Sequence, residues 1–191
     1  MLAELPDFSA KRAELGPERI AIEEVATGRA LTYAELDRRA AQGAELLRAR
    51  KVGEGDRVAI LCRNRTAFFE LLFACAKIGA ILVPLNWRMP PTELDQLLTD
   101  CTPKLLFHGA EDAETVAEIM YPPPAIALDG DYEGLVDKAE PRVSRRFWPA
   151  SDTWYLLYTS GTTGRPKGVI YTYRMALANQ VNIGTAIDLR S

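Results

Sequence analysis

Short apolar segments alternate with segments of helical spacing along most of the chain, and this alternation limits the folds available to it. Strand-like runs lie at residues 57–62, 81–85, 104–107 and 125–128, and helix-like stretches such as residues 66–78 separate them. Strands that alternate with helices pair mostly in parallel and are covered by the helices that connect them. The sequence therefore predicts an α/β fold with a layered, largely parallel sheet flanked by helices.

Several helices of this pattern carry start and stop residues. Thr32 and Glu35 have the spacing of a capping box, and Thr92 and Asp95 repeat that spacing further along the chain. Gly79 directly follows the apolar stretch at residues 66–78, where a glycine suits the C-terminal end of a helix. We therefore expect helices to begin after Thr32 and Thr92 and to end before Gly79.

The remaining segments are less regular. Residues 20–25 and 30–33 alternate in polarity around a turn and predict a hairpin. Residues 112–120 predict a helix, which the following run of three prolines would end. Residues 130–151 are polar and contain proline, and they are interpreted as a surface connection.

Composition excludes several classes of function. The 191 residues include 48% hydrophobic types, enough for a sizeable core, and the formal net charge is −3. This acidic balance gives no sign of nucleic-acid binding. No apolar run reaches the length of a membrane span, and the polar first residues do not resemble a signal peptide. We expect a cytoplasmic protein with no transmembrane segment and no nucleic-acid partner.

The cysteines and the single histidine do not form a recognisable catalytic or metal pattern. Cys62, Cys75 and Cys101 fit no zinc or redox spacing, and all three fall in apolar stretches, so we interpret them as reduced core residues. His108 could act as a base, but no nucleophile or carboxylate motif accompanies it. A residue at the end of a strand is the favoured interpretation.

Residues 158–169 carry the strongest chemical signal. They read Tyr-Thr-Ser-Gly-Thr-Thr-Gly-Arg-Pro-Lys-Gly-Val and lie between strand-like runs at residues 153–158 and 169–172. The hydroxyl groups, which can donate hydrogen bonds to phosphate oxygens, belong to Thr159, Ser160, Thr162 and Thr163. The glycines, which allow the backbone to approach a ligand closely, are Gly161, Gly164 and Gly168. Lys167 adds a cation, so this loop is a candidate phosphate site.

The loop differs from the phosphate loop of nucleotide kinases and GTPases. That motif needs Gly-Lys followed by Ser or Thr, whereas Lys167 is followed by Gly168 and Val169. It also joins a strand to a helix, whereas this loop joins two strand-like runs, and a helix is expected only later, at residues 174–187. A featureless glycine-threonine surface turn is the other interpretation, and the ordered string between two apolar strands disfavours it.

Residues 158–169 resemble the phosphate-binding signature of the AMP-forming adenylate superfamily, which includes acyl-CoA synthetases, firefly-luciferase-like enzymes and peptide-synthetase adenylation domains. Earlier elements of that superfamily are resembled, in the same order, by residues 31–36, 55–60, Asn64, 77–80 and 83–86. Taken alone, most of these upstream residues would indicate only a fold. The resemblance therefore extends over nearly the whole chain.

Two details place the chain within that superfamily. Asn86 and Arg88 after Val-Pro-Leu resemble acyl- and aryl-CoA ligases, whereas adenylation domains more often carry Asp after the same Pro-Leu. One position departs from the pattern, because Tyr173 stands where many relatives have histidine. The resemblance therefore gives no support here to any role of that histidine.

The resemblance implies a two-step reaction with ATP, a small carboxylic acid and CoA as substrates. The acid attacks the α-phosphorus of ATP and releases pyrophosphate, and the thiol of CoA then attacks the acyl carbon and releases AMP. The residues implied to hold the β- and γ-phosphates are Thr159, Ser160, Gly161, Thr162, Thr163 and Gly164. Lys167 is the candidate catalytic residue, which either stabilises the leaving pyrophosphate or orders the loop. Mg²⁺ is implied with ATP, and the hydroxyl of Ser160 or Thr159 is a candidate ligand.

The resemblance also bears on domain organisation. It implies that residues 1–191 are the N-terminal segment of the large AMP-binding domain, ending shortly after the loop at residues 158–169, and that the small C-terminal domain is absent. We expect the chain alone to be inactive, and an exposed sheet edge would allow a homodimer. The alternatives are a peptide-synthetase-type adenylation domain, a stand-alone nucleotide-binding module without catalysis, and a purely structural fragment.

Overall fold

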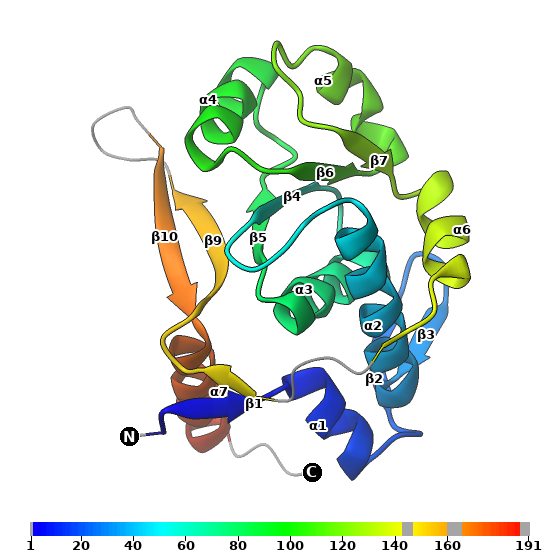
Figure 1. Cartoon of the computed structure of the whole chain (residues 1–191), viewed down its shortest axis with the longest axis vertical. Helices are drawn as coiled ribbons and strands as arrows, with labels where there is room; N and C mark the ends of the chain where they lie inside the picture. Colours follow the sequence, from blue (N-terminus) through cyan, green and yellow to red (C-terminus); the bar gives the residue numbers. More distant parts are fainter. Residues whose placement is uncertain (1, 143–146, 160–165, 188–191) are drawn as a thin grey trace.

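A six-stranded sheet forms the centre of the molecule (Figure 1). The computed structural model describes residues 2–142, 147–159 and 166–187. The order of the strands in the sheet is β10-β9-β5-β4-β6-β7. Their bounds are β4 Arg57–Leu61, β5 Ile81–Leu85, β6 Leu105–His108, β7 Ala125–Ala127, β9 Thr153–Thr159 and β10 Lys167–Thr172. All neighbouring pairs are parallel except β9 and β10, which are antiparallel, so the predicted α/β fold with a largely parallel sheet is confirmed.

Helices cover both faces of the sheet. The first face is covered by α2 (Tyr33–Ala49), α3 (Thr66–Ile78) and α6 (Asp131–Lys138), and the second by α4 (Pro91–Cys101) and α5 (Ala113–Ala117). Successive side chains of a strand point to opposite faces, and β4 follows this rule. Val58 and Ile60 join the core on the first face, and Ala59 and Leu61 join the core on the second. Strands buried on both faces are typical of parallel sheets, which explains their nearly continuous apolar sequences.

Two small sheets complete the fold. The predicted hairpin is confirmed as β2 (Ile20–Glu24) and β3 (Arg29–Thr32), which pair antiparallel. At the lower end of the molecule in Figure 1, β1 (Glu4–Pro6) pairs with β8 (Phe147–Pro149). In the chain, α1 (Phe8–Leu15) lies between β1 and β2, and the last helix is α7 (Tyr173–Ala186). The aromatic side chains of Trp148, Trp154 and Tyr173 form the core of this end.

The helix signals were right in two places and wrong in a third. Thr32 and Glu35 form the predicted capping box, and Gly79 follows α3 with a left-handed φ of 74°. The predicted capping box at Thr92 and Asp95 is wrong. Here α4 begins at Pro91, with Pro90 at its N-cap and no side-chain cap, because proline at the first helical position is already preset in φ.

The carboxylate of Asp95 has another partner, and this partner explains a second error. It accepts hydrogen bonds from the backbone N–H of Met120 at 3.0 and 3.2 Å. A longer helix would need that N–H for its own backbone ladder. The predicted helix at residues 112–120 is therefore shorter and consists of a single 3₁₀ turn (Ala110–Asp112) followed by α5.

The interpretation of residues 130–151 as a surface connection is also wrong. The segment contains α6 and β8, and it contributes Tyr132, Val136 and Trp148 to the core, each at most 2% exposed. The segment thus has few apolar residues, but these three are buried, whereas Phe147 is 55% exposed. Its polar composition therefore reflects the outer face of α6 rather than an absence of packing.

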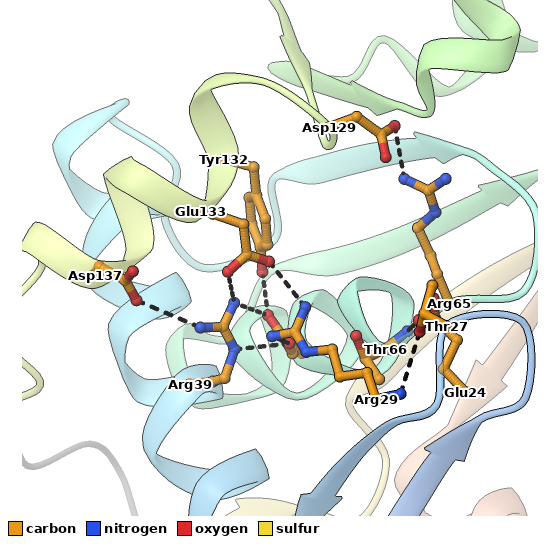
Figure 2. A network of polar contacts seen from close by, with 11 residues as sticks. Glu24, Thr27, Arg29, Arg39, Arg65, Thr66, Asp129, Tyr132, Glu133 and Asp137 are labelled. Carbon is orange, nitrogen blue, oxygen red and sulfur yellow. Dashed lines mark hydrogen bonds and ion pairs between the residues drawn. The ribbon is translucent and has the colours of Figure 1, made fainter.

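A buried polar network fastens α6 to the first face. Glu70 of α3 is fully buried, and its carboxylate accepts hydrogen bonds from the Arg39 guanidinium at 2.8 and 2.9 Å and from the Tyr132 hydroxyl at 2.9 Å. Arg39 also bonds Glu133, and Figure 2 shows this guanidinium between Glu133 and Asp137 of α6. A buried charge needs such partners, and these tie α2, α3 and α6 together.

Two of the three cysteines and the histidine are placed as expected, whereas Cys62 lies at the border of the core. Cys75 and Cys101 are buried free thiols, and Cys62 is a partly exposed one whose pKa is raised to about 12 by burial. His108 is the last residue of β6, which confirms its interpretation as a strand-end residue.

Within the part of the chain that the structure describes, no helix has both the length and the apolar character that crossing a membrane requires.

Candidate functional site

The carboxyl ends of β4, β5, β6 and β9 lie along one edge of the sheet, because these strands are parallel. In α/β proteins this edge is where ligands bind. Thr159 ends β9 at this edge. The predicted roles of five neighbouring residues remain predictions, because these residues lie outside the described part of the chain: Ser160, Gly161, Thr162, Thr163 and Gly164.

The two ends of the candidate phosphate loop lie opposite each other. Thr159 and Lys167 are partners in the antiparallel register of β9 and β10, and both are exposed. The predicted arrangement of strand, loop and strand is therefore confirmed. The pairing places a hydroxyl group and an ammonium group at the same end of one hairpin, where both are accessible to a ligand.

Gly168 allows the Tyr158 side chain to lie close to the backbone of the opposite strand. It pairs with Tyr158 across the two strands, and the tyrosine ring lies against it. A Cβ atom at residue 168 would be 3.3 Å from Cζ and 3.4 Å from the hydroxyl oxygen of Tyr158. A larger residue at this position would therefore crowd the Tyr158 ring. Burial and a hydrogen bond to Asp100 raise the pKa of Tyr158, so its hydroxyl remains a donor at neutral pH.

A cluster of cationic and aromatic side chains lies further along the same edge. The guanidinium carbon of Arg63, after β4, is 3.5 Å from the ring centroid of Trp87, and that of Arg88 is 3.8 Å from the same centroid. Such contacts are favourable cation–π interactions. Sequence reasoning selected Arg88 by resemblance and missed Arg63. Its position could have been noticed in the sequence, because Arg63 follows a strand-like apolar run and would therefore lie at the ligand-binding edge of the sheet.

Arg63 also partners a buried carboxylate. Its Nη1 donates to Oδ1 of Asp112 at 3.0 Å, while Oδ2 of Asp112 is buried without a hydrogen-bond partner in the described structure. Burial raises the pKa of Asp112 despite the neighbouring arginine. Among residues 2–142, 147–159 and 166–187, no three His, Cys, Asp or Glu side chains are grouped to hold a metal ion.

Tyr173, which departs from the pattern of many relatives, has a packing role here. It is 2% exposed, and its ring stacks on Trp154 at 5.4 Å and on Trp148 at 5.9 Å between centroids. Thr172 caps the helix that begins at Tyr173. This residue therefore joins β10 and α7 to the aromatic core.

Comparison with known families decides the classification. A family model described as AMP-binding enzyme matches residues 9–190. The chain belongs to this family. The match extends over nearly the whole chain, so the predicted membership of the adenylate-forming superfamily is confirmed.

The curated relatives are named for two kinds of acyl acceptor. The chain is 42% identical to a feruloyl-CoA synthase from an Amycolatopsis species over 187 residues, which are 98% of this chain and 37% of that protein. It is 37% identical to the fatty acid–[acyl-carrier-protein] ligase ScoC of Streptomyces coeruleorubidus over 79% of this chain and 30% of that protein. The chain thus spans well under half the length of these relatives.

A solved AMP-binding structure confirms the fold. The o-succinylbenzoate CoA synthetase of Bacillus subtilis, in complex with its acyl-adenylate intermediate, matches 98% of this chain and 48% of its own. The TM-score is 0.84 at 31% identity. The arrangement of β4 to β10 described above is therefore an architecture that this family uses.

Proposed function

We propose that the chain is the N-terminal segment of the large domain of an AMP-forming acid–CoA ligase. The observation that carries the proposal is the β9–β10 hairpin, which places Thr159 and Lys167 together at the carboxyl edge of a parallel sheet. The hairpin belongs to a complete phosphate-binding signature in a member of the AMP-binding enzyme family. CoA ligases and synthases among the relatives support the choice of reaction.

In the first step an oxygen of the substrate carboxylate attacks the α-phosphorus of MgATP. The bond to the β-phosphate breaks, and pyrophosphate leaves with the negative charge. Carboxyl groups titrate near pH ~4, so the nucleophile is already ionised and no general base is needed. The protein must hold the phosphates and stabilise the leaving charge. The ammonium group of Lys167 and the hydroxyl group of Thr159 are suited to this task.

In the second step the thiol of CoA attacks the acyl carbon of the adenylate, and AMP leaves. Magnesium enters with ATP as part of the substrate, held mainly by phosphate oxygens, and Thr159 or Ser160 offers it one hydroxyl ligand. We propose that the chain alone does not complete this reaction, because it spans well under half the length of relatives that do. Formation of acyl-CoA by the isolated 191-residue chain would contradict this part of the proposal.

A carrier protein is the alternative acceptor. ScoC, which resembles this chain, is named for transfer to an acyl-carrier protein. Both acceptors present a thiol, so the first step would be the same. Offering the adenylate CoA and a phosphopantetheinyl carrier in parallel separates the two. A stand-alone nucleotide-binding module would bind ATP and transfer nothing to either acceptor.

Lys167→Ala tests the assignment of the hairpin. In the protein of the complete reading frame, we expect this change to slow acid-dependent pyrophosphate release by about 100-fold, the usual loss for one stabilising group. Binding of the acid should change little, because the lysine faces the phosphates. Lys138→Ala is the matched control, since Lys138 is an exposed lysine of α6 on the far helix layer. Unchanged pyrophosphate release in Lys167→Ala would contradict the assignment.

A further inference from the structure

We infer that Asp100 of α4 is a positioning residue for the hairpin that carries Thr159 and Lys167, and that it acts through the hydroxyl group of Tyr158. The inference rests on the proposed function, because that function gives the hairpin its task. It assigns a role to a surface carboxylate that has no part in the phosphate-binding signature.

The contact joins two elements that are distant in sequence. The Tyr158 hydroxyl donates a hydrogen bond to Oδ2 of Asp100 at 2.5 Å, across 58 residues of chain. A hydrogen bond to a charged acceptor is stronger than one between neutral groups. Tyr158 directly precedes Thr159, so the bond acts at the very base of the candidate phosphate loop.

Asp100 belongs to a firmly packed element. It lies in the last turn of α4, whose buried side chains Leu94, Leu97 and Leu98 are at most 4% exposed. These leucines pack on β4 and β5 in the core of the second face. A group fixed to α4 is therefore fixed to the rigid part of the sheet.

The Tyr158 side chain reaches both strands of the hairpin as well as α4. Its ring lies against Gly168 of β10, the partner of Tyr158 in the register. The next pair along the same two strands is Thr159 and Lys167. Holding this one ring therefore holds the backbone on both sides of the candidate site.

Among the described residues, Leu156 and Tyr158 also pack against the core of the second face. β9 pairs with β5 through Tyr155 and Leu82, and Figure 1 shows the paired strands β9 and β10 at the margin of the sheet below α4. A groove of about 1010 Å³ lies between α4, Met120, Tyr121 and Pro166, so side chains do not fill that space. The bond from Tyr158 to Asp100 bridges α4 and the hairpin beside this groove.

Orientation is what such a bridge supplies to catalysis. A displacement of about 1 Å in a group that positions substrate can cost about 100-fold in rate. Loss of one of several supports should cost less, and we expect about tenfold. The loss should fall on the adenylation rate and not on the KM for the acid, since Tyr158 and Asp100 act on the phosphate side of the reaction.

The test uses a double-mutant cycle in the protein of the complete reading frame. Tyr158→Phe keeps the ring against Gly168 and removes the hydroxyl, and Asp100→Ala removes the acceptor. Each should lower the kcat of ATP–pyrophosphate exchange about tenfold with the KM for the acid unchanged, and the double variant should be no slower than either. Asp100→Asn keeps an acceptor oxygen and should restore most of the rate.

Tyr121→Phe is the matched control, because Tyr121 lines the same groove, is 78% exposed and should behave as wild type. Backbone amide exchange in the same variants gives an independent readout. Tyr158→Phe and Asp100→Ala should speed exchange in β9 and β10 and leave β4 and β6 unchanged. A structural role without positioning would lower thermal stability while the rate stayed the same.

The two proposals can fail separately. If the wild type exchanges no pyrophosphate with any acid, the proposed function fails, and amide exchange alone decides whether Asp100 holds the hairpin. Additive effects in the cycle, or equal amide exchange in Tyr158→Phe and wild type, would overturn the positioning role.

Discussion

The centre of the sheet and its β9–β10 margin are packed in very different ways. In β4 and β5, Val58 and Leu82 are fully buried, because helices cover both faces. In the hairpin, Leu157, Val169 and Ile170 are 41%, 45% and 55% exposed. The centre therefore secures the fold through many contacts, whereas the candidate chemistry lies on a margin whose geometry depends on a few specific ones.

Exposed apolar side chains are also found on α7. Met175, Val181 and Ile183 of that helix are 44% to 55% exposed. Contiguous exposed apolar surface is typical of regions that contact another domain or chain. A homodimer through the edge strand β10 remains a prediction, and oligomeric state in solution would test it.

The largest difference between the regions should appear at Glu70. Glu70→Ala removes the one fully buried carboxylate among the partners of Arg39 and leaves the buried Tyr132 hydroxyl without its acceptor, which costs about 3–5 kcal/mol in the free energy of unfolding. Asp137→Ala removes another partner of Arg39, but its side chain is 66% exposed, so we expect a change within about 0.5 kcal/mol. Urea unfolding followed by tryptophan fluorescence measures both. Similar values for the two variants would contradict the account of the centre.

A smaller effect is expected from a matched pair of leucines. Leu82→Ala creates a cavity in a fully buried strand and should cost about 2–5 kcal/mol. Leu157→Ala removes a side chain that is already 41% exposed, and we expect a loss below about 1 kcal/mol. The same urea titration applies. Equal losses would mean that the margin is as closely packed as the centre.

The smallest expected effect separates stability from activity at two glycines. Gly79→Ala forces a left-handed φ on alanine and places Cβ 3.0 Å from Cγ of Glu54, so stability should fall by about 1–2 kcal/mol. Gly168→Ala crowds the Tyr158 ring and should change stability by less than about 0.5 kcal/mol. Pyrophosphate exchange should instead fall in Gly168→Ala and stay normal in Gly79→Ala. Normal exchange in Gly168→Ala together with reduced exchange in Gly79→Ala would contradict the placement of the candidate site at the hairpin.

The central sheet was predictable because short, continuous stretches of sequence indicate its strands and helices. Because they are buried on both faces, β4, β5 and β6 have nearly continuous apolar sequences. The start of α2 is marked in the sequence by the Thr32–Glu35 capping box. The pairing of β1 with β8 was not predictable, because it joins Leu5 to Trp148 through strands of three residues each. Such short strands have no periodicity to detect, and their pairing depends on the finished tertiary structure.

The candidate site also has features that the sequence predicts and features that only the folded structure shows. The hydroxyl groups, the glycines and Lys167 were readable from one continuous string of residues. The contacts of Arg63 with Trp87 and of Asp100 with Tyr158 were not, because each joins separate segments that meet only at the edge of the folded sheet. Local sequence thus indicates the chemistry, whereas the support of that chemistry depends on long-range packing.

The decisive measurement is acid-dependent exchange of pyrophosphate into ATP by the full-length protein, because it reports directly on the proposed formation of an acyl-adenylate. A panel of aromatic and aliphatic acids should be assayed with magnesium present, and CoA should be added afterwards. We expect exchange that requires an acid, followed by release of AMP and formation of a CoA thioester. A folded protein that binds ATP but exchanges no pyrophosphate with any acid of the panel would contradict it.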